Sequence, residues 1–233
     1  MSTTTAFPIR QWPTLTITGE SVKYAVHRIF CVGRNYAAHA AEMGAEVDRE
    51  APFYFTKSAL AFAASGQTLP YPPATSNYHH EVELVVAIGA EAFRIAPAQS
   101  RGAIYGYGCG LDMTRRDLQL AAREKQRPWD TAKDVEHSAV IADITPADRF
   151  GVPASQRIRL TVNGEPRQAG RLSDLAWGVD ELISDLSHYY HLAPGDLIMT
   201  GTPAGVGPVR PGDEIVGEIE GLTPVHLTVG QPE

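Results

Sequence analysis

Short apolar segments separated by glycine and proline occur along almost the whole of this chain. Its 233 residues include 21 glycines and 17 prolines, which are spread throughout. Both residue types interrupt helices and favour turns, so this distribution predicts many short strands and argues against a helical bundle. Strands and helices do not alternate strictly, so a doubly wound parallel sheet is not supported. We therefore predict a mainly β fold with a few helices, of the α+β class.

Eight segments have the alternating or continuous apolar pattern of β-strands. They cover residues 28–33, 52–56, 81–89, 103–111, 157–163, 196–200, 213–219 and 223–229. Asn163 and Gly164 lie at the end of the segment 157–163 and are the residue types that a tight hairpin turn prefers. The pattern predicts one domain over residues 28–233, preceded by a short extension over residues 1–27.

Helical signals are fewer, and three are usable. Residues 36–43 are rich in alanine, follow a possible cap at Asn35 and end before a glycine. A second helix is expected to open at Thr114 and to end before Pro128. A third is expected from Ser173 to about residue 190. Its apolar stripe would pack on a sheet and consists of Leu175, Val179, Leu182, Ile183 and Leu186.

Charge and cysteine content narrow the class of protein. The chain has 27 acidic and 20 basic residues, a net charge of −7, and no basic block suited to a phosphate backbone. Its amino terminus lacks the apolar core of a signal peptide, and no apolar run approaches the length of a membrane span. Cys31 and Cys109 lie in apolar surroundings and do not suggest a disulfide framework. We expect a cytoplasmic protein that binds neither nucleic acid nor membrane.

The segment 78–89, YHHEVELVVAIG, places Glu81 and Glu83 on one face of a strand and apolar residues on the other. The two carboxylates either face water or, about 7 Å apart along the strand, form part of a site for a hard divalent cation. Such a site needs a third acid, and Asp112 is a candidate at the end of an apolar, glycine-rich strand. Asp112 could equally be a turn residue, and the sequence does not show that the three meet.

A histidine and a glutamate share one face of the first predicted helix. His39 and Glu42 are three residues apart, so the carboxylate can orient the imidazole and raise its basicity. Such a pair can act as a general base that removes a proton from water. The short helix lies between glycines and could act as a lid over the site. A solvated surface pair is the alternative. His79 and His80 lack the spacing of a zinc site and are expected to play a supporting role.

Polar and cationic candidates lie further along the chain. Arg116 and Gln119 are three apart on the second predicted helix and could point back toward the acids. Lys57 and Lys133 stand beside aromatic or small residues, and either could be an ordinary surface lysine. Residues 200–208 lack the ending of a phosphate-binding loop, but backbone N–H groups and the Thr202 hydroxyl could bind an anion there.

Seven motifs occur in the order found in the fumarylacetoacetate hydrolase family, which this chain resembles from about residue 28 to 230. They are GRNYAAHAAEMG, FTKSA, HHEVELVVAIG, GCGLDMTRRDLQ, PWDTAK, VNGEPRQ and GDLIMTGTPAGVGPVRPGDEI. The resemblance implies a mixed β-roll or sandwich fold of the family's C-terminal-domain type and a homodimer. It implies a Mg²⁺ or Mn²⁺ ion bound by Glu81, Glu83 and Asp112, and His39 with Glu42 as the water-activating pair.

The chain looks most like the acylpyruvate and fumarylpyruvate hydrolases, the latter enzymes of gentisate breakdown. This resemblance implies substrate contacts for Arg116, Gln119, Lys133 and Thr202. Lys133 is also a catalytic candidate, expected with Arg116 to hold the substrate carboxylate or the oxyanion. Two departures stand out: Ser58 replaces an expected proline, and the segment after Lys133 is unusually acidic, so that Glu136 or His137 could affect substrate preference.

The expected reaction is hydrolysis of the C3–C4 bond of an acylpyruvate by a water that His39 deprotonates, with pyruvate leaving as its enolate. Fumarylpyruvate has a second carboxylate, for which Arg34 and Lys57 are candidate partners. Oxaloacetate decarboxylation or tautomerisation of an oxo-dioate would use the same enolate and stays an alternative. A non-catalytic dicarboxylate-binding protein is a more remote one.

Overall fold

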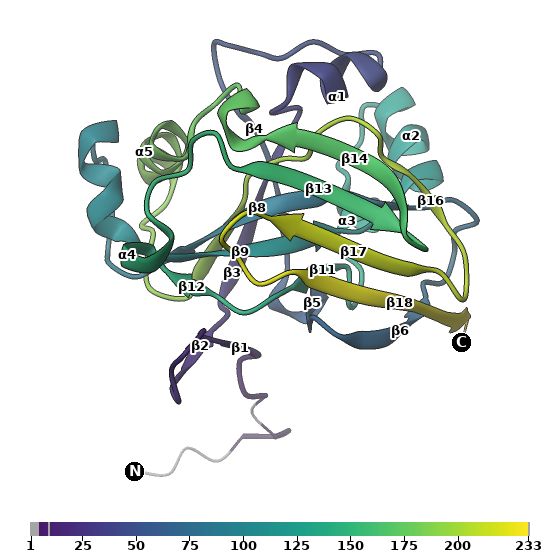
Figure 1. Cartoon of the computed structure of the whole chain (residues 1–233), viewed down its shortest axis with the longest axis horizontal. Helices are drawn as coiled ribbons and strands as arrows, with labels where there is room; N and C mark the ends of the chain where they lie inside the picture. Colours follow the sequence, from purple (N-terminus) through teal and green to yellow (C-terminus); the bar gives the residue numbers. More distant parts are fainter. Residues whose placement is uncertain (1–4, 9, 233) are drawn as a thin grey trace.

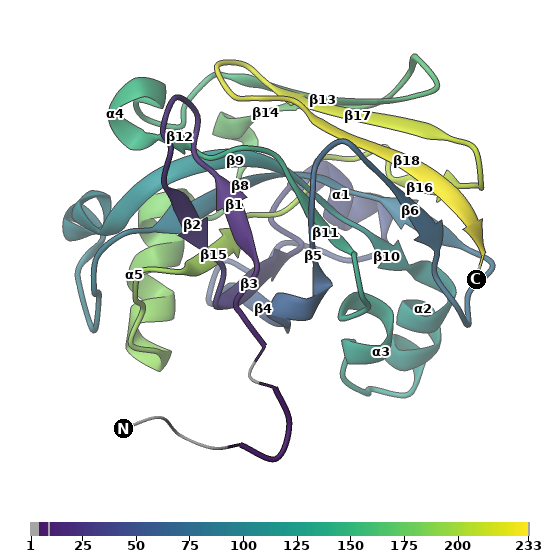
Figure 2. The same ribbon diagram turned by 90° about the horizontal axis from the view of Figure 1, so that it is seen from below.

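Two large β-sheets lie face to face in the computed structural model, which describes residues 5–8 and 10–232 (Figure 1). The outermost ends of the predicted extension and domain, residues 1–4 and 233, are outside the described part. Seen from below, a five-stranded sheet covers one face of a larger sheet, and helices α2, α3 and α5 lie on the other side of that larger sheet (Figure 2). The mainly β prediction is confirmed.

The larger sheet has eight strands and supplies the framework of the site. Its order is β4 (Phe53–Lys57), β3 (Arg28–Gly33), β15 (Asp196–Met199), β8 (Val82–Ile88), β9 (Ile104–Asp112), β11 (Ala139–Ile141) and β5 (Phe62–Ala64), with β12 (Thr145–Pro146) paired to β9. Most pairs are antiparallel, but β15 runs parallel to β3 and β11 parallel to β5. The sheet is therefore mixed, as the β-roll expectation requires.

The remaining strands form three smaller sheets. The five-stranded sheet has the order β14 (Glu165–Arg171), β13 (Arg157–Val162), β17 (Glu214–Ile219), β18 (Val225–Pro232) and β6 (Gln67–Tyr71). A three-stranded sheet joins β10 (Thr114–Arg115), β7 (Tyr78–His80) and β16 (Gly207–Val209). β1 (Thr14–Thr16) and β2 (Lys23–Ala25) form a hairpin.

In the described part of the chain, five short α-helices and three 3₁₀ turns connect the strands. The helices are α1 (Ala37–Glu42), α2 (Arg116–Glu124), α3 (Asp130–Lys133), α4 (Ala147–Phe150) and α5 (Val179–Tyr189). The 3₁₀ turns are η1 (Ala59–Ala61), η2 (Pro97–Ala103) and η3 (Leu172–Asp174). None of the helices in the described residues is long and apolar enough to cross a membrane.

Strand β8 is buried on both faces, which is more than the alternating pattern required. Val82, Leu84, Val86 and Ile88 enter the core between the two large sheets. On the opposite face, Val85 and Ala87 enter a second core. The strand is broken after His80, so Glu81 lies between β7 and β8 and not within one continuous strand.

The hairpin before residue 28 contributes to this second core. Leu15, Ile17, Tyr24 and Val26 are buried there together with residues of β8 and β15. Ile17 also bridges to Ile144, next to the eight-stranded sheet. The β1–β2 hairpin of the predicted extension is thus packed against the domain, whereas Phe7 and Trp12 before it are exposed.

The third predicted helix is wrong at its start. α5 begins at Val179, because Gly178 is its N-cap and donates its N–H to the Glu181 carboxylate at 2.7 Å. Residues 172–174 form η3, and Leu175 pairs with Tyr36 as a β-bridge, so Leu175 is not part of the helical stripe. The local pattern could not show this pairing, since its partner is far away in the sequence.

Two other local predictions have different outcomes. Asn35 is not the cap of α1, because its buried side chain bonds to the backbone of Trp177 and Thr200. Asn163 and Gly164 do form the turn of the β13–β14 hairpin, both with positive φ of 53° and 79°. Cys31 and Cys109 are buried and free, in agreement with the absence of a disulfide framework.

Candidate active site

Three acidic side chains meet where β8 and β9 run side by side. The antiparallel register places Glu83 opposite Gly110, and the Asp112 N–H donates to the Glu81 carbonyl at 2.9 Å. Each of the three carboxylates offers an oxygen, and these oxygens all lie within 4.8 Å of one another. Glu81, Glu83 and Asp112 are 4%, 2% and 0% exposed. The expectation that the acidic face turns to water is therefore excluded.

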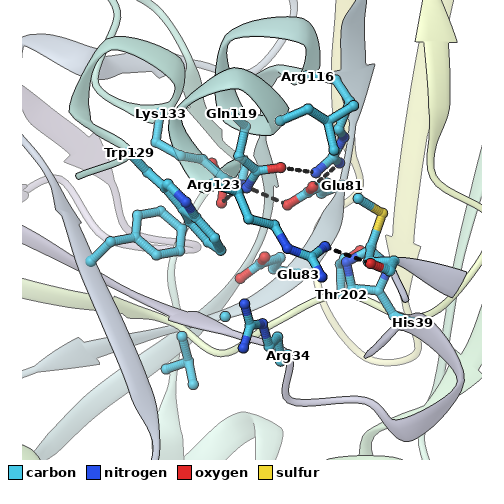
Figure 3. Close-up of a pocket in the computed structure, with 16 residues that line it drawn as sticks. Arg34, His39, Glu81, Glu83, Arg116, Gln119, Arg123, Trp129, Lys133 and Thr202 are labelled. Atoms are coloured by element: carbon cyan, nitrogen blue, oxygen red, sulfur yellow. Dashed lines mark hydrogen bonds and ion pairs between the residues drawn. The ribbon is translucent and has the colours of Figure 1, made fainter. Parts of the chain in front are cut away.

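Basic side chains surround two of these acids (Figure 3). Lys133 Nζ, from α3, lies 2.8 Å from a Glu81 oxygen and 2.6 Å from an Asp112 oxygen. Arg116, the first residue of α2, pairs with the other Glu81 oxygen. Lys57 Nζ, at the end of β4, lies 2.9 Å from the second Asp112 oxygen. Among the described residues, Glu83 forms no ion pair with a basic side chain, and it accepts the Gly201 N–H at 2.7 Å.

Because of this unequal pairing, the pKa values of Glu81 and Glu83 shift in opposite directions. Burial alone would raise the pKa of Glu81, but Lys133 and Arg116 outweigh it and hold that pKa below its usual range. Burial raises the pKa of Glu83 well above its usual range, and repulsion from Asp112 and Glu81 adds to the effect. Glu83 is thus the acid that gains most from a further positive charge.

The three residues form a divalent-metal site, and their chemistry fits the ion. Carboxylate oxygens are the donors that Mg²⁺ and Mn²⁺ prefer, and three of them leave positions for other ligands. Asp112 Oδ1 is buried and accepts no hydrogen bond among the described residues, although Lys57 is close in distance. A buried oxygen of this kind has a lone pair available for a cation.

The predicted general base, His39, lines the same pocket, and its partner Glu42 lies next to it. His39, on α1, is buried and lines the cavity together with the three acids. Its Nδ1 lies 3.1 Å from Glu42 Oε2, and the Glu42 carboxylate also accepts the Gly205 N–H at 3.1 and 3.2 Å. Because a carboxylate only accepts, Nδ1 carries the proton and Nε2 is left free as a base. Glu42 itself is not in the pocket lining.

The loop after β15 completes the pocket through a chain of hydrogen bonds. Gln168 Nε2, from β14, donates to Thr202 Oγ1 and to the Pro203 carbonyl, both at 2.7 Å. Gln168 Oε1 accepts the Val82 N–H and pairs with His80 Nδ1, each at 3.1 Å. The Thr202 hydroxyl oxygen therefore accepts a hydrogen bond from Gln168, and its O–H can donate to a group bound in the pocket.

Comparison with known proteins agrees with this geometry. The model of the fumarylacetoacetate hydrolase C-terminal domain matches residues 28–230. The chain belongs to the fumarylacetoacetate hydrolase family. A fumarylpyruvate hydrolase of a Ralstonia species is 55% identical over 82% of this chain and 100% of its own length. The oxaloacetate tautomerase YcgM of Escherichia coli is 40% identical over 87% of this chain and 93% of its own.

A solved member of the family shows the same fold. It is the fumarylpyruvate hydrolase of Pseudomonas aeruginosa in complex with Mn²⁺ and pyruvate, with 45% identity and a TM-score of 0.94. The alignment covers 98% of this chain and 100% of that one. The β-roll expected for this family is therefore the observed fold.

The structure brings most of the residues predicted for this family's site into one small pocket of about 40 Å³. The predicted residues that line it are Arg34, His39, Glu81, Glu83, Asp112, Arg116, Gln119, Lys133 and Thr202. Glu42 lies behind His39. Lys57 lies behind Asp112, buried against Ser138 at 2.7 Å and against main-chain carbonyls, so it is not placed to contact a substrate.

The two histidines before Glu81 support neighbouring groups. His79 Nδ1 faces the Arg116 Nε at 3.5 Å, and its Nε2 lies 2.8 Å from Asn77 Oδ1. Burial lowers the pKa of His79 to about 4, and the adjacent charge of Arg116 adds to this effect. His79 is thus neutral near pH 7 and helps to orient Arg116, while His80 pairs with Gln168.

Several residues at or beside the pocket were not predicted, and four of them have aromatic or polar side chains. Phe55, Arg123 and Trp129 line it, and Gln168 supports it from β14. Arg123 had a detectable signal, because it follows Arg116 by seven and Gln119 by four residues on the same helix face. The others had none, since their approach depends on pairing between distant strands.

Proposed function

We propose that this chain is a divalent-metal-dependent hydrolase that cleaves the C3–C4 bond of an acylpyruvate, with fumarylpyruvate as the favoured substrate. Water and fumarylpyruvate would give fumarate and pyruvate. The observation that carries the proposal is one pocket lined by both a buried carboxylate triad and His39, with Glu42 bonded to His39 from behind. The 55% identity to the Ralstonia fumarylpyruvate hydrolase supports the choice of substrate.

In the proposed hydrolysis, His39 acts as the general base and Glu42 orients it. His39 Nε2 removes a proton from a water molecule, while Glu42 holds the opposite ring nitrogen and stabilises the imidazolium that forms. The water oxygen adds to the C4 carbonyl, the C3–C4 bond breaks, and its electron pair leaves with pyruvate as the enolate. Protonation at C3 completes pyruvate. A bound Mg²⁺ or Mn²⁺ would supply Lewis acidity at the pyruvate half.

Lys133 and Thr202 are suited to hold oxygen atoms of the substrate. The Lys133 ammonium has three donors, of which two are directed to Glu81 and Asp112, so one is left for the pocket. The attraction of Asp112 and Glu81 outweighs burial and raises the pKa of Lys133, so the ammonium stays charged at neutral pH. Arg116 and Gln119 bond to each other at 2.5 Å, and this pair orients the guanidinium toward Glu81.

A second candidate is keto–enol chemistry on oxaloacetate. Its support is the 40% identity to the Escherichia coli oxaloacetate tautomerase over most of both chains. Hydrolysis remains the favoured proposal because the His39–Glu42 pair can activate water, and neither tautomerisation nor decarboxylation consumes water. A non-catalytic dicarboxylate-binding protein would have no use for this pair.

The test is a parallel assay of the Mg²⁺-loaded protein on fumarylpyruvate, acetylpyruvate and oxaloacetate, with products identified by NMR. We expect fumarate and pyruvate from fumarylpyruvate, and loss of this activity with a chelator. Turnover of oxaloacetate with no cleavage of either acylpyruvate would overturn the proposal in favour of the second candidate. Binding of all three without turnover would leave the non-catalytic alternative.

Other properties stay predictions. They are the choice between Mg²⁺ and Mn²⁺, a role in gentisate breakdown, a cytoplasmic location, a single catalytic domain over residues 28–233 and a homodimeric assembly. The bound Mn²⁺ of the Pseudomonas relative supports a divalent ion of this size.

A further inference from the structure

Two arginines in the pocket differ from its other cations. Arg116 and Lys133 pair with Glu81 or Asp112. Arg34 and Arg123 also line the pocket, but neither forms an ion pair with an acidic side chain of residues 5–8 and 10–232. Their positive charge is therefore available to an anion that enters the site.

Arg34 is held by aromatic rings rather than by acids. It follows β3 directly and has a left-handed backbone, with φ of 58°, which is unusual for a residue with a side chain. Its guanidinium lies 5.4 Å from the centre of the Phe53 ring and 6.0 Å from that of Trp129. Backbone strain of this kind is common at functional sites. Stacking on rings leaves the N–H donors at the guanidinium edge free.

Arg123 connects α2 to the end of α1. Its Nη1 donates to the Met43 carbonyl at 2.6 Å and its Nη2 to the Gly44 carbonyl at 3.1 Å. A guanidinium has five N–H donors, so these two bonds leave others for a ligand. Figure 3 shows the Arg123 side chain reaching into the pocket from α2, toward the region of His39 and Thr202.

Both arginines stand at the passage between two cavities. The small inner pocket contains the three acids, and a cavity of about 610 Å³ adjoins it. Five residues line both spaces: Arg34, Phe55, Arg123, Trp129 and Lys133. The acids line only the inner one. A linear substrate with its pyruvate end at the acids would thus extend past Arg34 and Arg123.

We propose that Arg34 and Arg123 form a subsite for the second carboxylate of a dianionic acylpyruvate and thereby select fumarylpyruvate over acylpyruvates with an uncharged tail. The subsite rests on the proposed function. Phe55 and Trp129, which line both cavities, offer flat apolar surfaces to the planar fumaryl chain between the two ends. Lys57, the other cation considered for this carboxylate, is buried behind Asp112 and is excluded from the subsite.

The subsite also reaches the helix that carries the predicted base. Arg123 donates hydrogen bonds to the backbone carbonyls directly after Glu42. A substrate carboxylate bound by Arg123 would thus be linked to the end of α1 through the Arg123 guanidinium. Occupancy of the subsite then favours the position of His39 seen here. An uncharged tail lacks this effect and should lower kcat as well as raise KM.

The kinetic test compares fumarylpyruvate with acetylpyruvate for the wild type and for Arg34→Gln and Arg123→Gln. A bond between charged groups contributes enough that each variant should lose about 10-fold to 100-fold in kcat/KM for fumarylpyruvate. For acetylpyruvate, Arg34→Gln should lose less than about 3-fold. Arg123→Gln also removes a contact that fixes α1, so it should lose activity on both substrates, with a loss about 10-fold larger on fumarylpyruvate. Arg127→Gln is the matched control, because Arg127 lines only the outer cavity, and it should leave both values unchanged.

Conservative variants and a binding measurement separate this role from a structural one. Arg123→Lys keeps the charge and should restore part of the preference for fumarylpyruvate. With the Mg²⁺-loaded protein, calorimetry should show fumarate binding more tightly than crotonate, which lacks one carboxylate, and Arg34→Gln should remove this difference. Equal losses on both acylpyruvates, or an unchanged preference for fumarate over crotonate, would overturn the subsite. A wild type that cleaves neither acylpyruvate would instead overturn the proposed function.

Discussion

The carboxylate triad and the His39–Glu42 pair line or adjoin the same pocket, but the chain holds them in different ways. Glu83 and Asp112 belong to neighbouring strands of the eight-stranded sheet, and Glu81 directly precedes the first of these strands. Every residue of β8 is buried, and pairing with β9 and β15 fixes its backbone on both sides. The acids therefore move only if the sheet moves.

The α1 segment, residues 35–50, is held by few contacts in comparison. α1 has only six residues, too few to be stable as a helix by itself. Apart from Asn35 and the Tyr36–Leu175 bridge at its start, the described polar contacts of the segment are Arg123 on the carbonyls after α1, Gly205 on Glu42, Trp177 Nε1 on the Asp48 carbonyl at 2.8 Å, and a long Arg49–Glu181 ion pair at 3.9 Å. They come from α2, from the loop after β15 and from residues 175–181.

From this difference we expect a rigid metal site and, as the sequence suggested, an α1 segment that acts as a lid. The inner pocket of about 40 Å³ has room for only a few water molecules, so substrate binding should require movement around it, and we expect this movement in the α1 segment. Substitutions in the triad should abolish the chemistry, and substitutions at the lid contacts should change how often the base is in place.

The largest effect is expected for the triad. Glu83→Gln should lower turnover by at least about a thousandfold, because a Lewis acid supplies several kcal/mol of stabilisation. Glu83 has no cationic partner, so the metal-free protein should keep its melting temperature. The metal-induced rise in melting temperature should disappear, and calorimetry should show weaker Mg²⁺ binding.

Glu81→Gln sharpens this prediction. It should lose metal binding as well, but it also leaves Arg116 and Lys133 with fewer negative partners in a buried place. Breaking a buried ion pair costs about 3–5 kcal/mol, so this variant should unfold at lower denaturant concentration. Equal stability of the Glu81 and Glu83 variants would contradict the unequal pairing described above.

The next effect concerns the base. His39→Gln should lower kcat by about 10²- to 10⁴-fold, the usual contribution of a general base. Mg²⁺ affinity should stay at the wild-type value, because His39 is on the α1 segment and not in the triad. A variant that cleaved acylpyruvates at the wild-type rate would remove the assignment of His39 as the base.

A smaller effect is expected from the loop that holds Glu42. Gly205 has a φ of 98°, and a Cβ there would lie 2.0 Å from the Arg167 carbonyl oxygen. Gly205→Ala must shift this N–H away from Glu42, and such a misplacement should lower kcat by about 10-fold. Gly207→Ala is the control, because a Cβ at Gly207 has only an ordinary contact at 3.6 Å. Equal kcat values for the two variants would show that the bond to Glu42 is unimportant.

The smallest effect is expected at Trp177. Trp177→Phe keeps a ring beneath the Arg49 guanidinium, which lies 4.6 Å from the ring centre, but removes the hydrogen bond to Asp48. One such bond is worth about 1 kcal/mol, so kcat/KM should fall by about 5-fold at most. Trp12→Phe, far more exposed at 59%, should have no effect. A loss as large as that of His39→Gln would mean that Trp177 does more than fix the α1 segment.

Local patterns in the sequence were sufficient for most of the large strands and for the alternation along β8. They were insufficient for β7, β10 and β16, which have two or three residues each and exist only because distant segments pair. The start of α5 was misplaced for the same reason, since Leu175 pairs with Tyr36.

The candidate site shows a similar limit. The spacing of Glu81 and Glu83 suggested a metal site, but only the pairing of β8 with β9 brings Asp112 to them. The position of Lys57 could not be predicted, because its burial behind Asp112 depends on strand β4 at the edge of the sheet. Whether a lysine faces a pocket or supports an acid is decided by tertiary packing.

The most direct test of the proposed mechanism is hydrolysis of fumarylpyruvate in ¹⁸O-labelled water by the Mg²⁺-loaded protein, with the product fumarate examined by mass spectrometry during the first turnovers. If a water activated by His39 attacks the C4 carbonyl, fumarate carries solvent oxygen in its new carboxylate, and His39→Gln forms this labelled product far more slowly. Fumarate without solvent label, or conversion of the substrate with the C3–C4 bond intact, would contradict the mechanism.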